Sequence, residues 1–246
     1  MLGAIAGDII GSRPRSKPCR DPVASLIGPD HHYTATTILT VATAHALLSK
    51  SEPDEIYMKY AVKFPEVRDL ATENADALRE VPWVCPVGWA FSGIGSVLLE
   101  SIIAVRAAGC GKEQSSAAQA VAAAVFWAKS GLSKEEIRAG LPGRFGLDLI
   151  GDDGSRAGNP FTSALVCFLE SNSFEQTLQS VVSAGGTDVG CRAAIAGALA
   201  EASDGGLPPR IVGEVSKRLP AGFLEVVHQF YRKHQMRVFT GEPMAV

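Results

Sequence analysis

The side chains best able to bind a metal ion or take part in catalysis lie in three short segments. Asp8 interrupts the apolar run GAIAGDIIGS, Thr34 opens the run TATTILTVATAHALL, and Asp188 stands in GGTDVG. Carboxylate oxygens are preferred ligands of hard cations such as Mg²⁺, and hydroxyl groups can hydrogen-bond to a ribose or a phosphate. These three segments are therefore the first candidates for metal or nucleotide chemistry.

Each candidate also has a structural interpretation. Asp8 could orient a metal-bound water, but we favour a hydrogen bond that joins it to the end of another helix. Asp188 could bind a metal or a ribose, or it could cap the helix that follows it, and both interpretations stay open. For Thr34, Thr36 and Thr37 we favour capping of the following helix over contacts with a ligand.

Three other groups of residues are weaker candidates. His31 and His32 are adjacent, so their rings point apart, and an exposed turn is the better interpretation. Asp152 and Asp153 belong to a DDG sequence that is typical of a turn. Trp83 is expected in the core or in the wall of a cleft. The sequence contains no Ser-His-Asp order, no phosphate-binding loop and no dinucleotide-binding fingerprint.

Composition narrows the class of protein. The formal net charge is −3 over 246 residues, so the chain lacks the excess of positive charge that is typical of nucleic-acid-binding proteins. The five cysteines are scattered without a CxxC pair, so neither a disulfide framework nor a zinc site is expected. The apolar N-terminus lacks a basic region, and no apolar stretch is long enough for a membrane span. We therefore expect a cytoplasmic protein with no nucleic-acid partner and no membrane partner.

Hydrophobic periodicity predicts helices almost everywhere and no strand. The expected helices cover residues 37–48, 56–64, 65–78, 87–107, 116–129, 133–140, 160–170, 174–184 and 191–204, with one more starting at Pro208-Pro209 and a last one over 223–231. A polar, Gly-rich loop separates them at 143–159. No repeat or linker divides the chain, so we expect one all-α domain over residues 1–246.

Five segments, in the same order along nearly the whole chain, resemble the ADP-ribosylglycohydrolase (dinitrogenase reductase-activating glycohydrolase-like) family. They are GAIAGDIIGS, YTATTILTVATAHALL, CPVGWAF, AQAVAAAVFWAKSGLSKEEIRAGLPGRFGLDL and SAGGTDVGCRAAIAGALAEA. The resemblance implies a single-domain orthogonal helical bundle with a cleft that binds ADP-ribose beside a pair of magnesium ions. It also implies hydrolysis of the glycosidic bond between ADP-ribose and a protein side chain.

The resemblance places the metal-site residues of the family on six positions of this chain: Thr34, Ala35, Thr36, Asp188, Gly190 and Cys191. The family has Thr-Asp-Asp at the first three and an Asp-x-Asp-Thr pattern at the others, so one acid of four remains. Trp83 stands where the family has an arginine. Two divalent ions need several carboxylates, so we expect neither a metal site nor a cofactor.

Three functions are compatible with this sequence. The favoured one is a catalytically inactive pseudoenzyme that acts as a binding or regulatory module for ADP-ribose, a nucleotide-like ligand or a protein partner. The alternative is a divergent hydrolase that cleaves ADP-ribose from modified protein or cleaves a related N- or O-glycoside. The third is a purely structural protein whose cleft is closed around Trp83. The ligand-binding candidates are Asp8, Thr34, Trp83 and Asp188.

Overall fold

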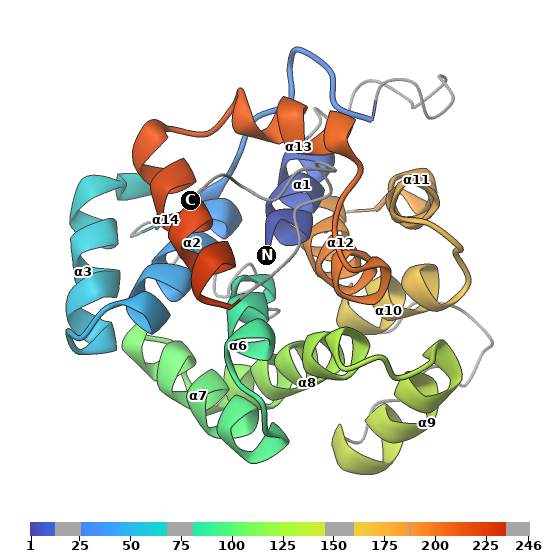
Figure 1. The fold of residues 1–246 in the computed structure, drawn as a ribbon, viewed down its shortest axis with the longest axis horizontal. Helices are drawn as coiled ribbons and strands as arrows, with labels where there is room; N and C mark the ends of the chain where they lie inside the picture. The colour runs from blue at the N-terminus through green and yellow to red at the C-terminus, as the bar shows by residue number, and fades with distance from the viewer. Residues whose placement is uncertain (13–25, 68–80, 146–159, 187, 235–246) are drawn as a thin grey trace.

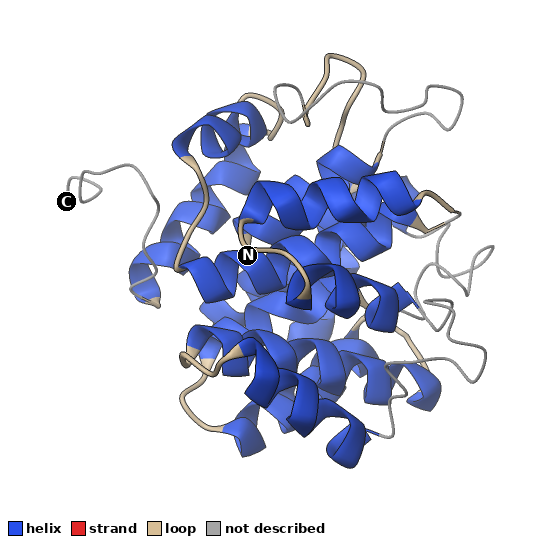
Figure 2. Cartoon of the chain, turned by 90° about the vertical axis from the view of Figure 1, so that its right-hand side faces the viewer, coloured by secondary structure: helices blue, strands red, loops and turns tan. Residues whose placement is uncertain are grey.

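The computed structural model describes residues 1–12, 26–67, 81–145, 160–186 and 188–234. This part of the chain contains helices and loops but no strand, which confirms the all-helical class (Figure 2). The helices are α1 (Leu2–Gly11), α2 (Ala35–Leu48), α3 (Pro53–Lys63), the 3₁₀ turn η2 (Pro82–Val84), α6 (Cys85–Ala90), α7 (Ile94–Ala107), α8 (Lys112–Lys129), α9 (Lys134–Phe145), α10 (Pro160–Leu169), α11 (Phe174–Ala184), α12 (Val189–Asp204), α13 (Pro209–Ser216) and α14 (Ala221–Lys233). None of the described helices is both long and apolar enough to cross a membrane.

Helices α1 and α12 form the centre of the bundle (Figure 1). They pack antiparallel, because Gly3 lies against Gly197, Gly7 against Ala193 and Gly11 against Gly190. A Cβ atom on Gly7 would come within 1.9 Å of the Ala193 carbonyl oxygen, so the two backbones touch without side chains between them. Glycine at every fourth position puts a continuous smooth face on one side of α1.

A buried polar cluster fixes the start of α1 to α12 and α14. The Glu201 carboxylate accepts hydrogen bonds from the terminal ammonium of Met1, from Gly3 N at 2.8 Å and from the Tyr231 hydroxyl. The same hydroxyl accepts from Leu2 N at 2.9 Å. Burial, followed by the charge of Glu201, raises the pKa of Tyr231 well above its usual value, so its proton stays in place.

We expect Tyr231→Phe to lower the free energy of unfolding by about 2 kcal/mol, because it leaves Leu2 N and one lone pair of Glu201 buried without a partner. The matched control is Tyr33→Phe, since the half-buried Tyr33 hydroxyl has no hydrogen bond in the described part of the chain. That control should change stability by less than about 0.5 kcal/mol. Urea unfolding of both variants measures the difference, and equal effects would contradict the role assigned to the cluster.

Three lysines cap the carboxyl ends of neighbouring helices. Lys129 Nζ donates to two carbonyls at the end of α6, at 2.6 and 2.8 Å. Lys134 Nζ does the same at the end of α10, and Lys233 Nζ binds Leu47 O at the end of α2, at 2.9 Å. Cations satisfy the unpaired carbonyls there and complement the negative end of the helix dipole.

The structure corrects two boundaries expected from periodicity. The apolar stretch 87–107 is not one helix, because α6 ends at Ala90 and α7 begins at Ile94 after Gly93. Where the helix is interrupted, Lys129 donates hydrogen bonds to the carbonyls of Trp89 and Phe91. The helix that starts after Ser133 does not end near Gly140 but continues to Phe145 with Pro142 inside it. Most of the helix expected over 65–78, and most of the loop expected over 143–159, lie outside the described residues.

Candidate functional site

The candidate residues meet where α1 ends between the first turns of α2 and α12. On one side, Asp8 of α1 binds the start of α2. On the other side, Gly11 packs directly against Gly190 of α12, whose Cα would lie 2.4 Å from a Cβ on Gly11. The loop before α2 joins the same place, since Ser12 Oγ accepts from His32 N at 3.1 Å. Segments about 150 residues apart in sequence therefore share one end of the bundle.

Asp8 is 1% exposed and uses both carboxylate oxygens to hold α2. Its Oδ2 accepts from Thr34 N at 2.8 Å, from Thr37 N at 3.2 Å and from Thr37 Oγ1 at 2.6 Å. Its Oδ1 accepts from Thr34 Oγ1 at 2.6 Å. Four donors from the first turn of α2 thus converge on one side chain of α1, where the carboxylate also faces the positive end of the α2 dipole.

Burial raises the pKa of Asp8 above its usual value of 3.8, although the hydrogen bonds from Thr34 and Thr37 act in the opposite direction. Removing a carboxylate from water penalises its charged form, and donors to its oxygens offset part of that penalty. Asp8 therefore has the environment of a group that joins two helices inside the core.

Thr34 is the N-cap of α2, as favoured from the sequence: its Oγ1 accepts from Thr36 N at 3.2 Å while it donates to Asp8. Thr37 is fully buried, and its hydroxyl is also committed to Asp8. Ala35 is buried at the first position of the helix. The hydroxyl of the half-buried Thr36 makes no hydrogen bond within the described residues, so it is the threonine of this turn best able to meet a ligand.

The residues at the start of α12 are more exposed than those at the start of α2. Asp188 is exposed and occupies the N-cap position of α12, where its carbonyl accepts from Arg192 N at 3.0 Å, but its side chain makes no capping bond. Gly190 and Cys191 are half-buried in the first turn of α12. Arg192 is 9% exposed, donates to Gly185 O and lies 3.4 Å from Ser163 Oγ.

Sequence reasoning missed Arg192. Its guanidinium holds Gly185 and Gly186, which have positive φ angles of 62° and 100° and form the loop into α12. The GG pair signalled such a turn, but nothing in the sequence indicated which side chain would secure it. A buried arginine in the first turn of α12 adds positive charge to an end that is already positive from the helix dipole.

Trp83 lies apart from this end of α1. It belongs to η2 beneath α2, is 1% exposed, and meets Tyr57 edge to face with 5.9 Å between ring centroids. His31 and His32 lie in the loop before α2, where the His31 carbonyl accepts from Arg218 Nε at 3.2 Å. Asp152 and Asp153 lie outside the described residues. Within the described ranges, no three side chains of histidine, cysteine, aspartate or glutamate come together as metal ligands would.

Comparisons with known proteins show what the chain is similar to. A model of the ADP-ribosylglycohydrolase family matches residues 68–238. Among solved structures, one described as "ADP-ribosylglycohydrolase-related protein complex" is similar to the chain with a TM-score of 0.65 and 20% sequence identity, covering 95% of each chain. At that identity the likeness establishes the fold. No curated protein sequence gives a match.

Proposed function

The chain belongs to the ADP-ribosylglycohydrolase family, and we propose that within it this protein has lost the dinuclear magnesium site and serves as a binding or regulatory module. The observation that carries the proposal is that Asp8 is fully occupied with hydrogen bonds inside the protein. Both of its oxygens hold α2, and the one acid left at the positions equivalent to the metal site is the exposed Asp188.

The available donors do not fit two magnesium ions. Mg²⁺ demands near-octahedral oxygen coordination and several carboxylates to offset its charge. Ala35 offers no oxygen donor in its side chain, Gly190 has no side chain, and Cys191 offers sulfur, which suits softer metals. Without a metal that activates water, hydrolysis at the family's rate is not expected.

The same end of the bundle is better suited to an anion. The N-terminal end of α12 lies there, and Arg192 in its first turn adds a full positive charge. The N–H groups of Thr34 and Thr37 at the start of α2 are already bound to Asp8. Thr36 provides a hydroxyl that can donate to a phosphate oxygen. The ligand we propose is therefore ADP-ribose or a related nucleotide, held through its diphosphate without a metal ion.

We also propose that the protein works in the cytoplasm. Its five cysteines show no paired spacing, and Cys85 is a buried thiol whose pKa burial raises to about 12. Such thiols persist in a reducing compartment.

Titration of the protein with ADP-ribose in the presence of a chelator tests the proposal. We expect binding that is unaffected by removal of divalent cations and that weakens with added salt. Thr36→Val should weaken it several-fold, whereas Thr43→Val, at the other end of α2, should not. If ADP-ribose does not bind, or binds only with magnesium, the proposed module is wrong.

Restoring the acids is a separate test of the lost site. We expect Ala35→Asp/Thr36→Asp/Gly190→Asp to create a magnesium-dependent thermal shift of a few degrees, because a ligand that binds only the native state stabilises it. Residue 190 has room for a side chain, since its nearest neighbour would lie 3.8 Å from the new Cβ. The control carries aspartate at the exposed positions Ser51, Ser92 and Ser130.

The chain as it stands should show no such shift with magnesium and no release of ADP-ribose from ADP-ribosylated protein. Release of ADP-ribose by the unaltered chain would instead support the divergent hydrolase. If magnesium raised the melting temperature of the control and of the restored variant equally, the effect would come from the added negative charge and not from a rebuilt metal site.

A further inference from the structure

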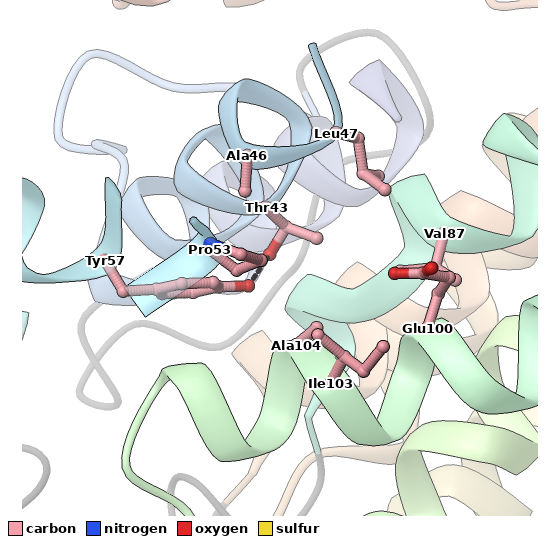
Figure 3. A pocket seen from close by; sticks show the side chains of 9 residues that line it. All are labelled: Thr43, Ala46, Leu47, Pro53, Tyr57, Val87, Glu100, Ile103 and Ala104. Atoms are coloured by element: carbon pink, nitrogen blue, oxygen red, sulfur yellow. Dashed lines mark hydrogen bonds between the residues drawn. The ribbon is translucent and has the colours of Figure 1, made fainter. Parts of the chain in front are cut away.

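A pocket lies between α2, α3, α6 and α7, and the proposed nucleotide site does not use it. Its walls are largely apolar, with Leu47, Val87 and Ile103 among the lining residues. Figure 3 shows two polar groups that enter it from opposite sides, the Tyr57 hydroxyl and the Glu100 carboxylate. Thr43 lies nine residues beyond Thr34 on α2, about 14 Å along the helix axis, so this pocket is remote from the end of α1.

Glu100 has no hydrogen-bond or ion-pair partner among the residues that the structure describes, although it is half-buried. A carboxylate that loses part of its hydration beside apolar walls costs free energy unless a cation or donors replace the lost water. Lys233, which approaches the neighbouring Leu47, is bound to the Leu47 carbonyl. The carboxylate is therefore available to a cation from outside the described chain.

The hydroxyls opposite Glu100 are held in place. Tyr57 and Thr43 share a hydrogen bond of 2.7 Å, and burial raises the pKa of Tyr57, so the phenol is neutral at physiological pH. The phenol oxygen has a second lone pair that can accept from an ammonium group. The pocket thus offers one negative charge and one neutral acceptor between aliphatic walls.

The size of the pocket limits what can enter. Its volume is about 60 Å³, and since one water-sized group needs roughly 10–15 Å³ by this measure, it holds about four to six non-hydrogen atoms. A lysine side chain, with its apolar stem and terminal ammonium, has that size and that division of polarity.

We propose that this pocket binds the ammonium end of a lysine side chain from a partner protein. The helices that form it carry the large apolar side chains that are exposed in the described part of the chain, Met58 and Val62 on α3 and Leu99 on α7. Exposed apolar side chains on the helices that form a charged pocket favour a polypeptide partner over a free amine, because a polypeptide can cover them as the lysine enters.

The test is an NMR titration of the ¹⁵N-labelled full chain with the peptide acetyl-Gly-Lys-Gly-amide and with a neutral counterpart, in which norleucine, the side chain of lysine without its ammonium group, replaces lysine. We expect the lysine peptide to bind with a Kd on the order of millimolar, as suits so small a ligand, and to shift the backbone signals of Thr43, Tyr57 and Ile103. The norleucine peptide should bind at least about tenfold more weakly.

Glu100→Gln should weaken the lysine peptide about tenfold and leave the norleucine peptide unchanged. Glu55→Gln, which removes the same charge from an exposed position of α3, should have no effect. A second readout needs no ligand: Glu100→Gln should unfold at the same or slightly higher urea concentration, since its carboxylate lacks a partner.

Equal affinity of the two peptides, or of Glu100→Gln and the unaltered chain for the lysine peptide, would overturn the proposal. Binding of n-butylammonium without binding of the lysine peptide would also overturn it, because the pocket would then serve a free amine. None of these results depends on whether ADP-ribose binds at the other end of α2.

Discussion

Gly7→Ala is expected to destabilise the protein by at least about 3 kcal/mol, at the upper end of what overpacking a core costs. The added Cβ would lie 1.9 Å from Ala193 O, 2.3 Å from Ala193 C and 2.6 Å from Ala194 N. All three are backbone atoms, so no side chain can turn away and the two central helices must separate. Because α1 also carries Asp8, that separation would move the start of α2.

The control for Gly7 is the same substitution in another helix. Gly213 lies inside α13, and a Cβ there would meet no atom within 4 Å. Gly213→Ala should therefore stabilise the protein by about 0.5 to 1 kcal/mol, since alanine loses less backbone entropy in a helix. Thermal unfolding measures both, and about 3 kcal/mol corresponds to roughly 6–12 °C for a chain of this size. A small effect of Gly7→Ala would contradict the close packing of α1 against α12.

Asp8→Ala is expected to cost about 3 to 4 kcal/mol, because several donors of the first turn of α2 lose their acceptor. The Thr37 hydroxyl is fully buried and has no water to replace the carboxylate. Asp8→Asn should cost about 1 kcal/mol or less. Its amide oxygen can take the place of Oδ2, while its NH₂ group can donate to Thr34 Oγ1. Urea unfolding separates the two variants.

The pH dependence of Asp8 follows from the direction of its pKa. Burial raises the folded-state pKa of Asp8 above the unfolded value, so the stability linked to this shift is present below the unfolded pKa and is lost as the pH rises through the folded pKa. Asparagine does not titrate. The stability of the unaltered chain relative to Asp8→Asn should therefore be greater near pH 4 than at pH 7. An unchanged difference would contradict the raised pKa.

Much of the helical architecture was predictable because each helix shows its apolar face in the sequence. The stretch from Thr37 to Leu48 shows the spacing of α2, and the Ser133 and Glu136 pair forms the expected capping box, with Ser133 N donating to Glu136 at 2.8 Å. The break between α6 and α7 was not predictable. It depends on Lys129, about 40 residues away, which binds the freed carbonyls.

The candidate site was predictable as a set of segments but not as a set of contacts. The family resemblance indicated which residues lie at the end of α1, and capping propensity indicated the role of Thr34. Glycine at residues 3, 7 and 11 was a readable signal for close helix contact. For Asp8 the sequence favoured a hydrogen bond to the end of another helix, which the structure shows, but it gave no sign that four donors of α2 would converge on this carboxylate. Nor did it distinguish Glu100, which has no partner in the described chain, from a solvated surface residue.

Calorimetric titration with Mg²⁺ tests the proposal that this end of the bundle has lost the ability to hold two magnesium ions. The titration should be made with and without saturating ADP-ribose, beside the variant Ala35→Asp/Thr36→Asp/Gly190→Asp. We expect no magnesium binding by the unaltered chain in either condition and measurable binding by the variant. Micromolar binding of magnesium by the unaltered chain that depends on Asp188 would contradict the account.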